Sequence, residues 1–141
     1  MFKHLYVTSL CILFLVHKCM GDICSTCLCS GTGTDPIINC HKKQLGNNDM
    51  LNVDLLLFNE HQAVNELILS DNNIVQLPGH ILKKLKNLRS LDLSWNVMED
   101  VHTGMFADLR NLENLNLSNN LLKKFDGSLL KILPKLEILN L

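Results

Sequence analysis

The chain has 141 residues, of which 47% are hydrophobic and 19% charged, a composition typical of one ordinary globular domain and not of a disordered segment. The formal net charge of -1 gives no general attraction to nucleic acid or to anionic lipid, so partners must be sought in local surfaces. Aromatic residues make up only 5% of the chain, so its core must be mainly aliphatic.

The start of the chain has the pattern of a secretory signal peptide. A charged beginning with Lys3 is followed by the apolar stretch Leu5 to Val16 and by small residues up to Gly21. The alternative is a membrane anchor, but the apolar stretch is about a dozen residues long and a spanning helix needs roughly 20. We therefore expect residues 1–21 to be removed and the product to be secreted or exposed at the cell surface.

Four cysteines remain after this segment, and they stand close together: Cys24, Cys27, Cys29 and Cys40. An even number of cysteines in an exported chain indicates two disulfides. The alternative is a zinc site in which His41 joins the thiolates, but an oxidising compartment disfavours it. Spacing alone does not choose among the pairings that four cysteines allow.

From Val64 onward the sequence repeats with a period of 24 residues. Four segments are apolar at positions 1, 4 and 6 of the unit, namely Val64 to Leu69, Leu88 to Leu93, Leu112 to Leu117 and Leu136 to Leu141. Apolar residues also recur at positions 11, 14, 19 and 22, and position 9 is Asn72, Asn96 and Asn120. One unit cannot bury its own apolar edge, so the units are expected to stack.

The spacing within each unit predicts a short strand followed by a return path. Alternation at positions 4 and 6 is typical of a strand, whereas an array of helices would need leucines three and four residues apart throughout. The side-chain amide of the asparagine at position 9 can bond backbone groups in the coils above and below. We therefore expect these asparagines to be structural.

The units VNELILSDNNIVQL, LRSLDLSWNVMEDV and LENLNLSNNLLKKF resemble the typical extracellular leucine-rich repeat, LxxLxLxxNxLxxLxxxxFxxLxx. That family includes Toll-type receptors, Slit proteins and small leucine-rich proteoglycans. The resemblance implies an α/β solenoid, a right-handed coil with a short parallel sheet on its concave face and irregular, 3-10 or helical return segments on its convex face.

The preceding segment, CSTCLCSGTGTDPIINC, resembles the cysteine-rich N-terminal cap of the same family. This resemblance implies disulfides from Cys24 to Cys29 and from Cys27 to Cys40. The stretch from Gly46 to Ala63 is longer than usual, and we expect a short helical insert at Met50 to Phe58. The expected organisation is signal peptide 1–21, cap 22–63, repeats 64–87, 88–111 and 112–135, and the start of a fourth repeat at 136–141.

In such a solenoid, positions 3, 5, 7, 8 and 10 point toward or border solvent on the concave face, and position 10 is Asn73, Val97 and Leu121. The candidate binding residues at these positions are Glu66, Ile68, Ser70, Asp71, Ser90, Asp92, Ser94, Trp95 and Asn114. None is basic, which favours a basic or neutral protein as ligand with Trp95 as its anchor. The alternative is a solvated sheet on which Trp95 is half-buried.

Two further features bear on the surface. The lysines Lys83, Lys84, Lys86, Lys131 and Lys135 fall on the return side, where a solvated convex face is favoured over a polyanion site. The only N-x-S/T sequon is Asn116-Leu117-Ser118, and a glycan on Asn116 would cover part of the predicted inner face.

The sequence contains no GxSxG, HExxH or Gly-rich phosphate loop, so we expect neither catalysis nor a cofactor or metal. The predicted function is an extracellular protein-binding module in recognition, signalling or adhesion, with a matrix scaffold protein as the alternative. Its partner would be another extracellular protein or a glycan, and not nucleic acid. Because the sequence stops six positions into a repeat, we expect a longer parent, which could carry a membrane tether, or else dimerisation through the open C-terminal edge.

Overall fold

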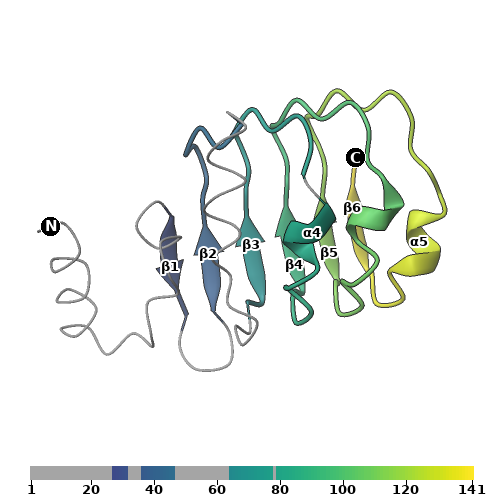
Figure 1. The fold of residues 1–141 in the computed structure, drawn as a ribbon, viewed down its shortest axis with the longest axis horizontal. Helices are drawn as coiled ribbons and strands as arrows, with labels where there is room; N and C mark the ends of the chain where they lie inside the picture. The colour runs from purple at the N-terminus through teal and green to yellow at the C-terminus, as the bar shows by residue number, and fades with distance from the viewer. Residues whose placement is uncertain (1–26, 32–35, 47–63, 78) are drawn as a thin grey trace, which may run out of the picture.

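The computed structural model of the chain describes residues 27–31, 36–46, 64–77 and 79–141. Within these ranges six strands form one sheet in chain order (Figure 1). The strands are β1 Leu28–Ser30, β2 Ile37–Asn39, β3 Glu66–Ile68, β4 Ser90–Asp92, β5 Asn114–Asn116 and β6 Ile138–Asn140. The expected signal peptide, Cys24 and the helical insert expected at Met50 to Phe58 lie outside the described residues.

The register of the sheet follows the 24-residue period. Strands β2 to β6 are parallel, and Leu67 pairs with Leu91, which pairs with Leu115, which pairs with Leu139. The side chains of Leu67, Leu91 and Leu115 are 0 to 1% exposed. The prediction that these leucines stack in a dry core is therefore confirmed.

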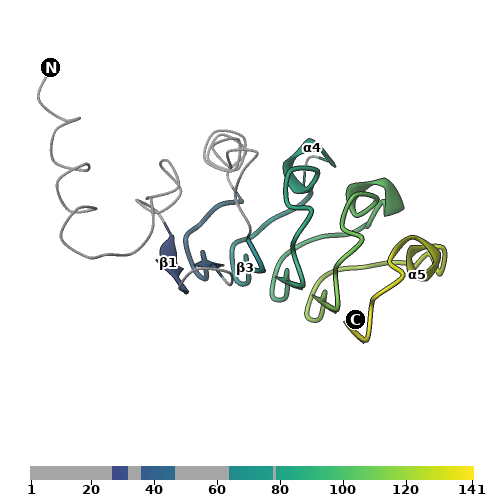
Figure 2. The same ribbon diagram turned by 90° about the horizontal axis from the view of Figure 1, so that it is seen from below.

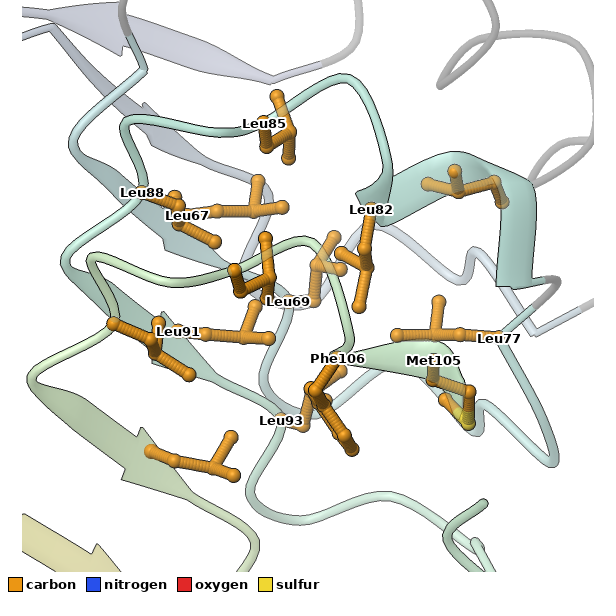
Figure 3. Close-up of a cluster of buried hydrophobic side chains, with 14 of the residues drawn as sticks. Leu67, Leu69, Leu77, Leu82, Leu85, Leu88, Leu91, Leu93, Met105 and Phe106 are labelled. Carbon is orange, nitrogen blue, oxygen red and sulfur yellow. The ribbon is translucent and has the colours of Figure 1, made fainter. Parts of the chain in front are cut away.

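Return segments lie on the other side of this core (Figure 2). Where the structure describes these segments, they contain two short α-helices, α4 Gly79–Leu82 and α5 Leu129–Ile132, and one 3-10 helix, η2 Thr103–Met105. Figure 3 shows Leu67, Leu91 and Leu93 from the strand side pointing toward Leu82 and Phe106 from the return side. The predicted α/β solenoid, with a short parallel sheet and helical or 3-10 return segments, is confirmed.

The return path buries one more position than the sequence analysis assigned to the core. Position 18 is occupied by Ile81, Met105 and Leu129, which are 1 to 4% exposed. Position 19 is buried at Leu82 and Phe106, but Leu130 is 54% exposed, because no described coil lies beyond α5 to cover it. The apolar residue at position 18 in all three units is the signal that would have revealed this position.

The asparagines at position 9 join neighbouring coils by hydrogen bonds. The side-chain amide of Asn96 donates to the carbonyl oxygens of Leu69, Leu93 and Ser94 at 2.9 to 3.2 Å. Its Oδ1 accepts the backbone N–H groups of Asn72, at 3.1 Å, and Ile74, at 2.9 Å. One side chain thus bonds both its own turn and that of the preceding coil, which confirms the structural role predicted for it.

The cap extends the solenoid by one antiparallel strand and one parallel strand. Strand β1 pairs antiparallel with β2, and Ile38 of β2 pairs with Leu67 and is fully buried. A disulfide joins Cys27 to Cys40, as the resemblance implied, which takes both sulfurs out of the alternative zinc site. Cys29 is also disulfide-bonded.

The turn that follows β2 is fastened to the first repeat. Asn72 Oδ1 accepts the backbone N–H of Lys43 at 2.7 Å, and the N–H of Gly46 donates to the Asn72 carbonyl at 2.8 Å. A Cβ atom on Gly46 would overlap with the carbonyl oxygen of Asn73, so the close approach of the two backbone segments requires glycine here.

The described part of the chain contains no helix that is long and apolar enough to cross a membrane.

Candidate functional site

The strand face, formed by the side chains at positions 3 and 5 of β3 to β6, is the first candidate surface. Of the predicted residues, Glu66, Ile68, Ser90, Asp92 and Asn114 lie on this face and are partly exposed. Together with Asn116, Ile138 and Asn140 they line a shallow hollow of about 180 Å³. The structure therefore brings these five predicted residues together on one surface.

Two predicted residues do not belong to the accessible surface. Ser70 and Ser94, at position 7, are only 7% and 5% exposed. Their carbonyl oxygens accept the side-chain amides of Asn72 and Asn96 at 3.1 and 3.2 Å, so position 7 is held under the turn. The expectation that these serines face or border solvent is wrong, because the asparagine ladder draws their backbone inward.

Position 8, directly after each strand, has an unusual backbone conformation. Asp71, Trp95 and Asn119 have φ values of 55 to 57°, in the left-handed region. The backbone N–H groups of Asp71 and Trp95 donate to the carbonyl oxygens of Ser94 and Ser118 in the next coil, at 3.1 and 3.0 Å, which holds the turn in place. Asp and Asn adopt this region readily, but a bulky side chain rarely does.

Trp95 combines this backbone strain with wide exposure, since its side chain is 63% exposed. In the neighbouring coils two more apolar side chains that follow the strand are exposed, Val75 at 59% and Leu121 at 57%. Hydrogen bonds from Val97 N–H to the Ile74 carbonyl at 3.1 Å, and from Leu121 N–H to the Met98 carbonyl at 2.9 Å, hold the coils together here. We call the surface formed by Val75, Trp95, Val97 and Leu121 the turn edge.

The charges on both sides of the turn edge are paired within the protein. Lys42 Nζ lies 3.4 Å from Asp71 Oδ2 on the cap side, and Lys123 Nζ lies 2.6 Å from Glu99 Oε2 on the other. The apolar side chains between these pairs therefore meet little unbalanced charge. The candidate site predicted from the sequence did not include Val75. The signal that could have revealed it is at position 12, which is apolar in this unit but charged in the next two, where it is Glu99 and Lys123.

The sequon residue lies on β5. Asn116 Oδ1 accepts hydrogen bonds from the backbone N–H and the hydroxyl of Ser118 at 3.1 and 2.7 Å, and its side chain is partly exposed on the strand face. A glycan attached there would occupy the hollow beside Asp92.

The described residues offer few groupings suited to chemistry. No group of three or more His, Cys, Asp or Glu side chains in the described ranges could hold a metal ion. His41 Nδ1 contacts Ser70 Oγ at 3.0 Å, and exposed His102 lies 3.8 Å from Asp100 Oδ2. What the geometry does provide is a strand face and an apolar turn edge that lie side by side on the outside of a stacked core.

A solenoid with an open sheet face of this kind belongs to the class of protein-interaction scaffolds. Residues 62–122 and 98–141 match the model of the leucine rich repeat family, and the two matches together span more than half of the chain. The chain therefore belongs to the leucine-rich repeat family, whose domains are in general non-enzymatic modules that bind other proteins. No curated protein sequence matches the chain closely enough to count as a relative.

Proposed function

We propose that the chain is an extracellular protein-binding module whose ligand docks on the strand face and the adjoining turn edge, with Trp95 as the anchor. The observation that carries the proposal is the state of Trp95, which is 63% exposed and has a φ of 55°. Folding gains little from either property, because the exposed indole remains in water and the left-handed conformation costs about 1 kcal/mol for such a residue.

A bound partner would recover this cost. Burying the exposed part of an indole contributes on the order of 3 kcal/mol by area, and tryptophan is enriched among the residues that dominate binding energy at interfaces. Asp71 and Asn119 occupy the same position in neighbouring coils with φ of 57°, so an ordinary turn residue would serve the fold at least as well as Trp95.

The size of the strand face supports a ligand that reaches the turn edge as well. Five parallel strands about 4.8 Å apart, each about 10 Å long, offer a face of only about 200 to 300 Å². A stable protein complex buries about 800 Å² on each partner. The exposed apolar side chains of the turn edge supply the additional contact area that a specific complex needs.

The charge of the strand face indicates what kind of partner fits it. Glu66 and Asp92 lie on this face, and among the described ion pairs neither has a basic partner. A ligand with basic or neutral side chains would avoid the cost of leaving these carboxylates opposite a like charge. The partner we propose is therefore a protein surface with an apolar centre and basic or neutral flanks.

The extracellular part of the proposal is supported by the pattern of residues 1–21 and by the cap disulfides, since disulfides persist in oxidising compartments. We favour recognition or adhesion over a purely structural matrix role, because a structural role alone does not require an exposed tryptophan in a strained backbone conformation, as Trp95 is. The matched test of export is to express the full chain with a C-terminal tag in cultured animal cells. Recovery from the medium with an N-terminus near residue 22 is expected, whereas uncut chain retained in the cytosol would refute export.

The test of the binding surface compares two variants that each remove one exposed apolar side chain. Trp95→Asn removes the anchor and suits the left-handed backbone, while Leu130→Asn removes a side chain that is 54% exposed in the return helix α5. Saturable binding of the labelled chain to the surfaces of cultured animal cells is measured for both. We expect Trp95→Asn to weaken binding at least tenfold and Leu130→Asn to leave it unchanged. Equal effects of the two substitutions would contradict the proposed anchor.

A further inference from the structure

A second charged surface lies at the opposite end of the strands, where the return segments lead back into the sheet. Its cations come from three consecutive coils: Lys83, Lys84 and Lys86 from the first repeat, Arg110 from the second and Lys135 from the third. All five residues are exposed. We call this surface the basic edge; only its lysines were considered in the sequence analysis, and Arg110 joins them through the register of the coils.

The cations of the basic edge are arranged in register. Lys86 and Arg110 both occupy position 23 of their repeats and therefore lie on neighbouring coils. Asn111 Nδ2 donates to the Lys86 carbonyl at 2.9 Å, and Lys135 Nζ donates to Asn111 Oδ1 at 2.8 Å. These bonds tie three coils together, so the row of cations extends over about 10 Å, given strand spacings of about 4.8 Å.

Most of this charge is not balanced within the described part of the protein. The ion pairs there involve Lys42, Arg89, His102 and Lys123, and none includes a cation of the basic edge. Asp108 occupies position 21 like Lys84 in the preceding coil, and Glu113 and Glu137 follow this edge at position 2, where Glu113 is paired with Arg89. A chain with a net charge of -1 thus gathers five exposed cations beside two acids that are unpaired among the described residues, Asp108 and Glu137, which costs self-repulsion.

We propose that the basic edge binds a linear sulfated polysaccharide that runs across the coils. Lysine heads are compact point charges that suit sulfate groups spaced along a flexible chain, and a row at successive coils can meet several such groups at once. This inference goes beyond the protein ligand proposed above. It shares with that proposal only the extracellular location, and it concerns the opposite edge of the sheet.

The neighbouring side chains favour a polysaccharide over a membrane or a nucleic acid. The apolar residues next to these lysines in the chain, Ile81, Leu82, Leu85 and Leu88, are 0 to 1% exposed, so none can insert into a bilayer as membrane-surface segments do. Single-stranded nucleic acid needs exposed aromatic side chains for base stacking. The exposed aromatic residues in the described ranges lie elsewhere, Trp95 at the turn edge and Phe125 beside Leu117 and Leu141.

The test uses heparin as the probe and two triple variants of the full chain with the same loss of charge. Lys83→Gln, Lys84→Gln and Lys86→Gln are combined in the first variant. The control combines Lys42→Gln, Lys123→Gln and Lys124→Gln, which are also exposed but lie away from the basic edge. Binding to immobilised heparin is measured from about 50 to 300 mM salt, with desulfated heparin as the probe control.

We expect the wild-type chain and the control to bind heparin with similar affinity and the basic-edge variant to bind about tenfold more weakly, since each exposed ion pair contributes roughly two- to threefold. The slope of log affinity against log salt should fall by about two for the basic-edge variant only. Asp108→Asn should strengthen binding about twofold, which provides a gain that misfolding cannot produce.

Three results would overturn the proposal. Equal losses in both triple variants would show that only net charge matters, and unchanged binding to desulfated heparin would show that sulfate is not recognised. Stronger binding to vesicles with 30% phosphatidylserine, or to single-stranded DNA, than to heparin would assign the basic edge to another anionic surface. Cell binding that depends on Trp95 is measured separately, so failure of either proposal can be told from failure of the other.

Discussion

The asparagine ladder allows the contribution of one side chain to be worked out bond by bond. In Asn96→Ala five hydrogen bonds are lost from a residue that is 4% exposed. The three carbonyl oxygens that the amide contacts keep other partners, because Leu69 also accepts from Asn72, Leu93 from Asn120, and Ser94 from the backbone of Asp71. Loss of the bonds from the amide to these three carbonyl oxygens should therefore lower the free energy of unfolding only slightly.

The two backbone N–H groups that lose their acceptor decide the magnitude. Asn72 N–H and Ile74 N–H bond Oδ1 of Asn96 in a buried turn, and each has no other acceptor among the described bonds. An unsatisfied buried donor costs about 1 to 3 kcal/mol, so Asn96→Ala should lower the free energy of unfolding by about 4 kcal/mol. Asn120→Ala leaves only the Met98 N–H without its acceptor in a partly buried turn, so its cost should be about 2 kcal/mol.

Urea unfolding followed by circular dichroism measures these differences in the oxidised protein. The control is Asn87→Ala, because Asn87 is exposed, and the change should stay within about 0.5 kcal/mol. Should Asn120→Ala cost as much as Asn96→Ala, the number of orphaned donors would not be what determines the loss, and the reasoning would fail.

Three further outcomes follow from the described contacts. Gly46→Ala should destabilise the protein by about 2 kcal/mol, because the new Cβ would meet the neighbouring turn, whereas Gly104→Ala, with nothing within 4 Å, should be neutral when both are melted in parallel. Changing both cysteines of the Cys27 to Cys40 bridge, which are 13 residues apart, to alanine should cost about 3 kcal/mol in the same assay, and a loss below 1 would contradict the cap's role. NMR titration should find the pKa of Asp126 below its ordinary 3.8, mainly through the backbone N–H of Ser128, so Ser128→Ala should restore it only in part. Because this pKa is lowered on folding, its contribution to stability is present above pH 3.8 and is lost as the pH falls below that value.

The parts of the fold that could be predicted from the sequence are those fixed by periodicity. A period of 24 residues with apolar positions 4 and 6 leaves one register that keeps Leu67, Leu91 and Leu115 in a shared core, and the sheet has that register. The role of the asparagines followed from the bonding capacity of an amide. In both cases the residue pattern within one repeat and the stacking of neighbouring repeats favour the same structure.

The predictions that failed depended on backbone detail that no periodicity encodes. Ser70 and Ser94 were assigned to the surface by counting alternate residues, but a strand of three residues ends before position 7, and the turn then carries these serines inward. Val75 was missed because it lies beyond the strand, at position 12, outside the positions that were assigned to the exposed face. The exposure of Leu130 could not be predicted from its own repeat, because it depends on whether a further coil covers α5.

The same coil geometry separates residues that hold the fold from residues that are free to vary. Positions 4, 6 and 9 face the core or the ladder in every unit, so a change there disturbs two coils at once. Positions 8 and 23 are outside the buried core: Asp71, Trp95 and Asn119 share one backbone geometry at position 8, and Lys86 and Arg110 are exposed at position 23. Because those positions bear little of the packing, a strained tryptophan and a row of unpaired cations persist without cost to the core. Specific binding is therefore expected at the two edges of the sheet, and substitutions there should change affinity with little change in the free energy of unfolding.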